Sequence, residues 1–184
     1  INMIIWIASY PKSGNTWVRS FLTSYYFCDN GIFDIDKLNL IEDYPNKQFF
    51  KEKVKQGEIH KHWETSQKDI LDQKKVKFLK THNSLITAFG NDFTKPEYTL
   101  GVIYVIRDPR NVITSVKNHN DLESYDEALR FMQDENKVLD DYPHLKNYAK
   151  TNIVNSWRIN YQSWLSTKSF RRLIIRYEDM VKNP

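Results

Sequence analysis

The chain of 184 residues carries a formal net charge of +4 at pH 7 and a sequence pI near 9.0, which suits an anionic ligand without identifying one. Its lysines are scattered among acidic residues, and its apolar stretch Met3–Ala8 is too short to cross a bilayer, so we expect neither a nucleic-acid nor a membrane partner. Cys28 is the only cysteine, which excludes an internal disulfide and favours a cytoplasmic location.

Strand-like and helix-like patterns alternate along the chain. Strands are expected at Met3–Ser9, Val76–Thr81, Leu100–Arg107 and Leu173–Tyr177. Helices are expected at Thr16–Phe27, Lys47–Gln56, Thr65–Gln73, Pro109–Asn118, Tyr125–Asp140 and Thr151–Ser166. The first and third strands are nearly continuous apolar runs, as in a parallel sheet covered on both faces. The pattern predicts a single α/β domain over residues 1–184, a P-loop-like, doubly wound parallel sheet flanked by helices.

A polar loop joins the first strand to the first helix, in the run Tyr10-Pro-Lys-Ser-Gly-Asn-Thr-Trp17. Such a loop directs backbone N–H groups, hydroxyls and Lys12 at a point above a helix N-terminus, where an anion is favoured. The spacing of a Walker A motif is absent. The loop therefore predicts a phosphate or sulfate site of another kind than that of the common NTPases.

Charged side chains follow two of the later strands. Lys80 and His82 are two apart, so they point to the same side of a strand end. A histidine there either acts as a general base or only makes a hydrogen bond at the edge of the core. Arg107 ends the third strand, and Ser115 lies about two turns into the next helix. Together they suit a phosphate, although Arg107-Asp-Pro-Arg110 alone is equally compatible with a helix start carrying a surface ion pair.

Four stretches in this order resemble the sulfotransferase family that uses 3′-phosphoadenosine-5′-phosphosulfate (PAPS), in particular its cytosolic branch. They are Tyr10-Pro-Lys-Ser-Gly-Asn-Thr-Trp17, Lys80-Thr-His82, Arg107-Asp-Pro-Arg-Asn-Val with Ser115, and Arg176-Tyr-Glu-Asp-Met180. The run Ser156–Trp164 also looks like the helix that precedes the last strand of that family. The resemblance implies sulfuryl transfer from PAPS to a hydroxyl or amine of a small-molecule or sugar acceptor, with 3′-phosphoadenosine-5′-phosphate (PAP) as product and no metal.

The resemblance also implies a role for each motif residue. Those around the 5′-phosphosulfate would be Lys12, Ser13, Gly14, Asn15, Thr16 and Trp17. Within this loop Lys12 would stabilise the leaving phosphate oxygen and Trp17 would lie near the adenine. Arg107 and Ser115 would bind the 3′-phosphate, and Tyr177 would contact the adenine. His82 would take the proton of the acceptor, with Lys80 assisting beside the transferred group.

The polar stretch 28–75 is interpreted either as an acceptor-side insert or as a set of solvated helices. Its aromatic residues either line an apolar or sugar-binding cleft or belong to the core. They are, with the residue just before the stretch, Phe27, Phe33, Tyr44, Phe49, Phe50 and Trp63. His60 and His62 lie in a segment that we expect to be exposed, so they do not suggest a metal site.

The sequence departs from the family pattern at several places. Asn15 replaces the usual threonine or serine, and Asn83-Ser84 follows His82 where the family has Leu-Pro. The basic segment that closes over the 3′-phosphate in the family would follow Pro184, so we expect it to be missing. Two alternatives remain open: a P-loop-related nucleotide kinase or NTPase, with Glu178-Asp179 as its acidic pair, and a sulfotransferase-like nucleotide-binding module without catalysis.

Overall fold

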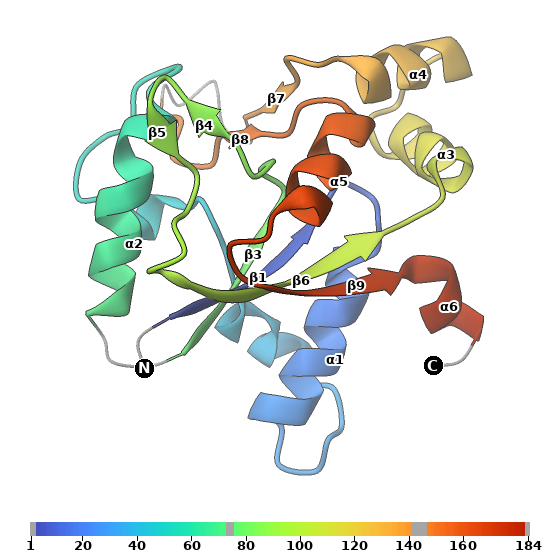
Figure 1. The fold of residues 1–184 in the computed structure, drawn as a ribbon. Helices are drawn as coiled ribbons and strands as arrows, with labels where there is room; N and C mark the ends of the chain where they lie inside the picture. Colours follow the sequence, from blue (N-terminus) through green and yellow to red (C-terminus); the bar gives the residue numbers. More distant parts are fainter. Residues whose placement is uncertain (1–2, 73–75, 141–146, 183–184) are drawn as a thin grey trace.

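A computed structural model describes residues 3–72, 76–140 and 147–182 (Figure 1). Its strands are β1 (Ile4–Ser9), β2 (Glu42–Asp43), β3 (Lys77–Thr81), β4 (Thr87–Ala88), β5 (Asn91–Asp92), β6 (Thr99–Ile106), β7 (Val138–Leu139), β8 (Asn152–Ile153) and β9 (Arg171–Arg176). Its α-helices are α1 (Asn15–Phe27), α2 (Trp63–Leu71), α3 (Pro109–His119), α4 (Tyr125–Gln133), α5 (Trp157–Ser166) and α6 (Tyr177–Lys182). Short 3-10 helices are η1 (Ile35–Leu40), η2 (Lys47–Phe49) and η3 (Ile59–His62).

The centre of the fold is a five-stranded parallel sheet in the order β2-β3-β1-β6-β9. β1 lies in the middle and pairs Ile7 with Lys80 on one side and with Ile103 on the other. The carboxyl ends of β1, β3 and β6 therefore meet at one edge, where a doubly wound sheet binds its ligands. The predicted α/β class, with a parallel sheet flanked by helices, is confirmed.

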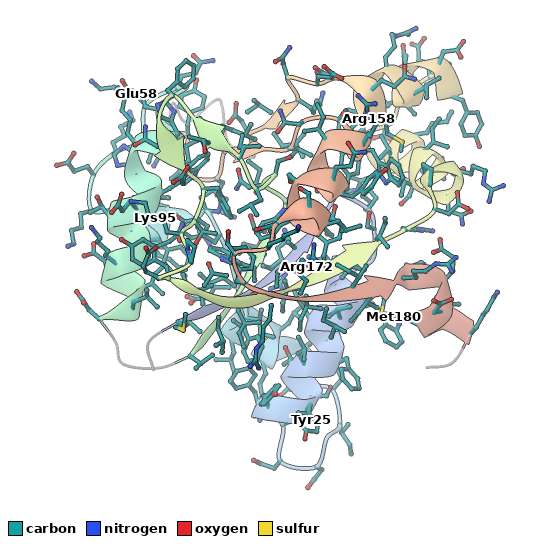
Figure 2. The ribbon with its side chains drawn as sticks, in the orientation of Figure 1. Tyr25, Glu58, Lys95, Arg158, Arg172 and Met180 are labelled. Carbon is teal, nitrogen blue, oxygen red and sulfur yellow. The ribbon has the colours of Figure 1, made fainter. Side chains whose placement is uncertain are left out.

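Helices cover both faces of the sheet (Figure 1). On one face, Val18 of α1 packs with Ile7 and Val105. On the other, Trp63 of α2 and Trp164 of α5 belong to the main core cluster. Figure 2 shows Tyr25 at the end of α1 that is remote from the sheet, so the N-terminal half of this helix is the part that approaches the site. Among the described residues, no helix has the length and apolar character needed to cross a membrane.

The prediction of a helix at Lys47–Gln56 is wrong. The segment makes one 3-10 turn, η2, and is already extended at Phe50. The rings of Phe49 and Phe50 lie 5.6 and 6.3 Å from the ring of the buried Tyr44. We attribute the difference to this aromatic packing, which draws two consecutive side chains toward the core and so works against a helical path.

Two other helices are shorter than expected. The helix expected to reach Asp140 ends at Gln133, because Val138–Leu139 instead form an antiparallel ladder with Asn152–Ile153. That ladder also removes the start of the last expected long helix, which begins at Trp157 behind the N-cap Ser156. Such pairings join residues far apart in sequence, and no local periodicity reveals them.

Smaller differences concern element ends. The helix expected from Thr65 begins two residues earlier, at Trp63, and Gln73, its expected end, lies outside the described residues. The last strand runs over Arg171–Arg176, and Tyr177 is the first residue of α6 rather than the end of the strand. The short α6 thus brings Tyr177 back toward the loop that follows β1.

Candidate active site

A cavity of about 600 Å³ opens at the carboxyl edge of the sheet. Its wall includes the motif residues Lys12, Lys80, His82, Arg107 and Ser115. They come from the loop after β1, the end of β3, the end of β6 and the middle of α3. The structure thus brings together the charged and polar side chains that the sequence placed at this edge.

The loop between β1 and α1 presents the positive end of a helix. Lys12 and Gly14 both have a positive φ, 66° and 94°, which turns the chain sharply into α1. The first turn of α1 contains no acidic residue, and no side chain caps it. Its free N–H groups and the partial positive charge of the helix end therefore favour an anion at this point.

Besides the hydroxyl of Tyr10 and the Nε of Arg19, two buried donors near this loop have no hydrogen-bond partner among the described residues. They are the hydroxyl of Ser13, whose residue is 1% exposed, and the Nε of Arg107. A buried donor without a partner costs about 1–3 kcal/mol. The oxygens of a phosphate or sulfate would supply the missing acceptors, so the donor set fits an anionic substrate.

Arg107 is held in place from two sides. Its Nη1 donates to the carbonyl oxygen of Lys12 at 2.9 Å, and its guanidinium lies 4.5 Å from the ring centroid of Tyr177. Ser115 faces the same cavity from α3. A planar guanidinium fixed in this way suits a phosphate group, because its fork of N–H donors matches the phosphate oxygens.

The imidazole of His82 is oriented by the end of β1. Its Nδ1 lies 2.8 Å from the carbonyl oxygen of Ser9. A carbonyl can only accept, so Nδ1 carries the hydrogen and Nε2 keeps a lone pair. Burial, followed by the positive charge of Lys80, holds the pKa of His82 well below its ordinary value of 6.5. The ring is therefore neutral at pH 7 and able to accept a proton.

The model of the sulfotransferase domain family matches residues 3–184. The chain belongs to this family. Its fold also matches that of retinol dehydratase, solved in a complex with retinol and PAP, with a TM-score of 0.52 and 15% sequence identity. This match covers 99% of the chain but 56% of retinol dehydratase, and at such identity it establishes the shared fold alone. No curated protein sequence matches the chain.

Three predicted site residues of this sulfotransferase domain do not line the cavity, namely Ser13, Trp17 and Tyr177, and a fourth, Asn15, lines it with its amide turned away. The amide of Asn15 turns inward and donates to the carbonyl oxygen of Ile7 at 3.0 Å and to the hydroxyl of Ser9 at 3.2 Å. Trp17 is 40% exposed and does not line the cavity, whereas the neighbouring Thr16 does. Tyr177 lies behind Arg107, against Gly14.

The stretch 28–75 contributes no residue to the wall of this cavity. Its aromatic residues divide between core and surface: Tyr44 and Trp63 are buried in the main core, and Phe33 is 41% exposed. Its assignment as an acceptor-side insert remains a prediction. The expected exposure of His60 is wrong, since the residue is 6% exposed and its ring packs 5.0 Å from that of Phe89. Over the described residues, no group of three or more His, Cys, Asp or Glu side chains gathers as a metal site would require.

Glu178 has a structural role that sequence alone left open. Its Oε1 accepts from the backbone N–H of Asp108 at 2.9 Å, just before α3 begins. Asp108 in turn accepts from the N–H of Arg110 at 2.9 Å and so caps that helix. The first residue of the acidic pair in the kinase or NTPase alternative therefore links α6 to the start of α3.

Sequence reasoning missed the residues that hold His82. Besides Ser9, the fully buried Asn160 of α5 donates to the carbonyl oxygen of His82 at 3.0 Å and accepts from the hydroxyl of Tyr104 at 2.7 Å. One signal was present: Asn160 lies three residues after Trp157 and four before Trp164, a helical spacing that puts it on an apolar face. A polar residue on such a face usually has a buried partner.

Proposed function

We propose that this domain transfers a sulfuryl group from PAPS to a hydroxyl or amine of a small-molecule or sugar acceptor, and releases PAP. Its place in the sulfotransferase family supports the donor. The observation that carries the reaction is the orientation of His82. Its Nδ1 donates a hydrogen bond to the carbonyl oxygen of Ser9, and its ring lines the same cavity as Lys12 and Arg107.

In this proposal His82 is the general base. Its neutral ring accepts the proton of the acceptor at Nε2 as the new oxygen–sulfur or nitrogen–sulfur bond forms. The carbonyl oxygen of Ser9 then stabilises the imidazolium, because it accepts from the Nδ1 hydrogen in both protonation states. The hydrogen bond from Asn160 to the carbonyl oxygen of His82 limits movement of the base during the step.

The loop after β1 would bind the 5′-phosphosulfate. The first N–H groups of α1, from Gly14 to Thr16, and the hydroxyls of Ser13 and Thr16 would donate to its oxygens. As the sulfur–oxygen bond to the phosphate breaks, negative charge grows on the bridging oxygen. The ammonium of Lys12 would neutralise it, with Lys80 beside the transferred group, in the way that cations stabilise phosphoryl transfer.

Arg107 and Ser115 would bind the 3′-phosphate. Both line the cavity on the side of β6 and α3, and Arg107 keeps its orientation through Lys12 and Tyr177. Because these contacts fix its guanidinium, Arg107 would favour PAP over a nucleotide that has no 3′-phosphate. Trp17 and Tyr177 remain proposals for the adenine side, since Trp17 lies on the outer face of α1 and Tyr177 beside Arg107.

The test is a calorimetric titration of the protein with PAP and with ADP, each with and without Mg²⁺. We expect PAP to bind more tightly than ADP, independently of the metal, and Arg107→Ala to remove the preference. Binding of ADP alone with a Mg²⁺ requirement would refute the proposal and favour a kinase. Tight binding of PAP with no PAP formation from PAPS, over a panel of phenols, alcohols, amines and sugars, would identify a nucleotide-binding module.

A further inference from the structure

Three charged side chains from three different elements meet beside the cavity: Arg19 and Lys80 are part of its wall, and Asp43 lies outside that wall. Asp43 of β2 lies between two cations: its Oδ1 is 3.2 Å from Nη1 of Arg19 and 3.5 Å from Nζ of Lys80. Arg19 belongs to α1 and Lys80 to β3, and both line the cavity. None of the four sequence motifs contains Arg19 or Asp43.

Arg19 fixes Asp43 from the side of the core. The residue is 8% exposed, and its Nη2 donates to the carbonyl oxygen of Ile41 at 2.6 Å and to that of Leu38 at 3.3 Å. These bonds tie the guanidinium to the chain immediately before β2. A planar guanidinium held at two carbonyls has little freedom, so it presents Nη1 to Asp43 in one direction.

The backbone then places Asp43 beside Lys80. β2 has only two residues, and it pairs with β3 so that Asp43 is in register with Lys80. The N–H of Tyr44 donates to the carbonyl oxygen of Lys80 at 2.7 Å and closes this pairing. Register partners of neighbouring parallel strands share a face, which is the face toward α1 and Arg19.

The ammonium of Lys80 can act on one group of a substrate only if a neighbouring residue, such as Asp43, restricts its position. The side chain of Lys80 is only 19% exposed, yet it has the many rotamers of a lysine and no planar head group to restrict them. A carboxylate whose own position is fixed restricts the ammonium to one part of the wall. It also lowers the mutual repulsion of Lys80 and Arg19, which would otherwise drive the two cations apart.

We propose that Asp43 is a positioning residue, which Arg19 locks in place and which holds the ammonium of Lys80 toward the transferred sulfuryl group. The inference rests on the proposed sulfuryl transfer. It assigns Asp43 an effect on PAPS, which carries the sulfuryl group, and none on PAP, which lacks it. If instead Asp43 only joined α1 to β2, its loss would act on both nucleotides alike and independently of Lys80.

The experiment is a double-mutant cycle read by calorimetric binding of PAPS and of PAP. Lys80→Met is expected to weaken PAPS binding about tenfold, and Asp43→Asn about fivefold, because one charged contact is lost in each case. PAP binding is expected to stay within about twofold of the wild type. The double variant is expected to bind PAPS with the same affinity as Lys80→Met alone, because Asp43 acts on PAPS only through the ammonium of Lys80.

Glu42→Gln is the matched control. Glu42 lies on the same two-residue strand and pairs with Lys77 of the same β3, outside the cavity wall, so the variant is expected to bind both nucleotides like the wild type. Asp43→Ser is a second replacement of the same residue. Combined with Lys80→Met, it is expected to give the same non-additive loss of PAPS affinity as Asp43→Asn. Full additivity of Asp43→Asn and Lys80→Met, or an equal loss of PAP and PAPS affinity, overturns the inference alone. A wild-type protein that binds neither nucleotide overturns the proposed function, and the inference with it.

Discussion

The ring of Tyr177 lies directly against the backbone of Gly14. A Cβ atom at position 14 would lie 2.2 Å from Cδ2 of Tyr177 and 2.6 Å from its Cε2. The same ring carries the guanidinium of Arg107, 4.5 Å from its centroid. Segments from the beginning, middle and end of the chain thus converge at the loop after β1, and the absence of a side chain at Gly14 permits their approach.

Gly14→Ala should therefore damage both the fold and the site. Gly14 has a φ of 94°, and a left-handed conformation costs an ordinary residue about 1–2 kcal/mol. Displacing the ring of Tyr177 adds about 1–3 kcal/mol. We expect the free energy of unfolding, measured by urea denaturation, to fall by about 2–5 kcal/mol, and PAP binding to weaken because Arg107 loses its support.

Gly57→Ala separates the two causes. Gly57 also has a positive φ, 73°, but nothing lies within 4 Å of a Cβ atom placed there. It should lose only the backbone contribution, about 1–2 kcal/mol, with PAP binding unchanged. Equal losses of stability in the two variants would mean that the contact of Tyr177 with Gly14 has no energetic weight.

The sheet and the meeting of the motif residues could be predicted from the sequence. Met3–Ser9 and Leu100–Arg107 are nearly continuous apolar runs, a pattern that does not depend on distant residues. Once both are strands of a parallel sheet, their carboxyl ends share an edge, so Lys12 and Arg107 are expected at the same edge. This inference needs only chain order and strand direction.

The support around the site could not be predicted in this way. The inward turn of the Asn15 amide depends on Ile7 and Ser9 being within hydrogen-bond reach, which is decided by the packing of α1 on β1. The pairing of Val138–Leu139 with β8 likewise joins segments whose local patterns favour continuous helices. Each case turns on a non-local contact, and such contacts override local propensity.

Replacement of His82 should separate catalysis from binding. His82→Ala removes the proposed base, so we expect the rate of PAP formation from PAPS to fall by about 10²–10⁴-fold with whichever acceptor is turned over fastest. The affinity for PAP should change little, because the proposed contacts to the nucleotide come from the loop after β1, Arg107 and Ser115 and not from His82. Wild-type turnover in His82→Ala would exclude His82 as the base, and a parallel loss of PAP affinity would indicate a structural role.

The depressed pKa of His82 predicts how stability depends on pH. Burial and Lys80 hold the native pKa below the ordinary 6.5, so between the two values the unfolded chain binds more protons than the native one. Stability due to this group is present above pH 6.5 and is lost as the pH falls toward the native pKa, by at most about 1.4 kcal/mol per pH unit.

The measurement is urea denaturation of the wild type and of His82→Gln between pH 5 and pH 8, where about pH 6.5 marks the unfolded pKa. The difference in unfolding free energy between the two proteins should be constant above neutrality and should shrink at lower pH, because the variant has no buried imidazole to protonate. A difference that stays constant down to pH 5 would contradict a depressed native pKa of His82.

Arg107→Lys should lose function although it keeps the charge. A lysine cannot donate to the carbonyl oxygen of Lys12, lie flat against Tyr177 and bind a phosphate with paired donors at once. We expect the affinity for PAP to fall about 10–100-fold, while that for AMP, which has no 3′-phosphate, changes little. Arg110→Lys is the control, since Arg110 is exposed and pairs only with Asp108 among the described residues. Equal losses for PAP and AMP would place Arg107 away from the 3′-phosphate.

Asn160 connects the core of the domain to the proposed base, His82. Its side chain accepts from the hydroxyl of Tyr104 and donates to the carbonyl oxygens of His82 and Val154, at 2.7, 3.0 and 2.9 Å. Asn160→Ala removes the hydrogen bonds to the buried hydroxyl of Tyr104 and carbonyl oxygen of His82, whereas the carbonyl oxygen of Val154 still accepts from the hydroxyl of Ser84. The free energy of unfolding should fall by about 2–4 kcal/mol.

Asn160→Asp tests which half of this network matters for catalysis. The carboxylate still accepts from Tyr104 but cannot donate to the carbonyl oxygen of His82, which it would repel. We expect the rate of PAP formation to fall at least as far as in Asn160→Ala, with PAP affinity retained in calorimetry. If Asn160→Asp kept the wild-type rate, the position of His82 would depend on Ser9 and β8 alone, since the backbone N–H of His82 also donates to the side chain of Asn152 at 3.3 Å.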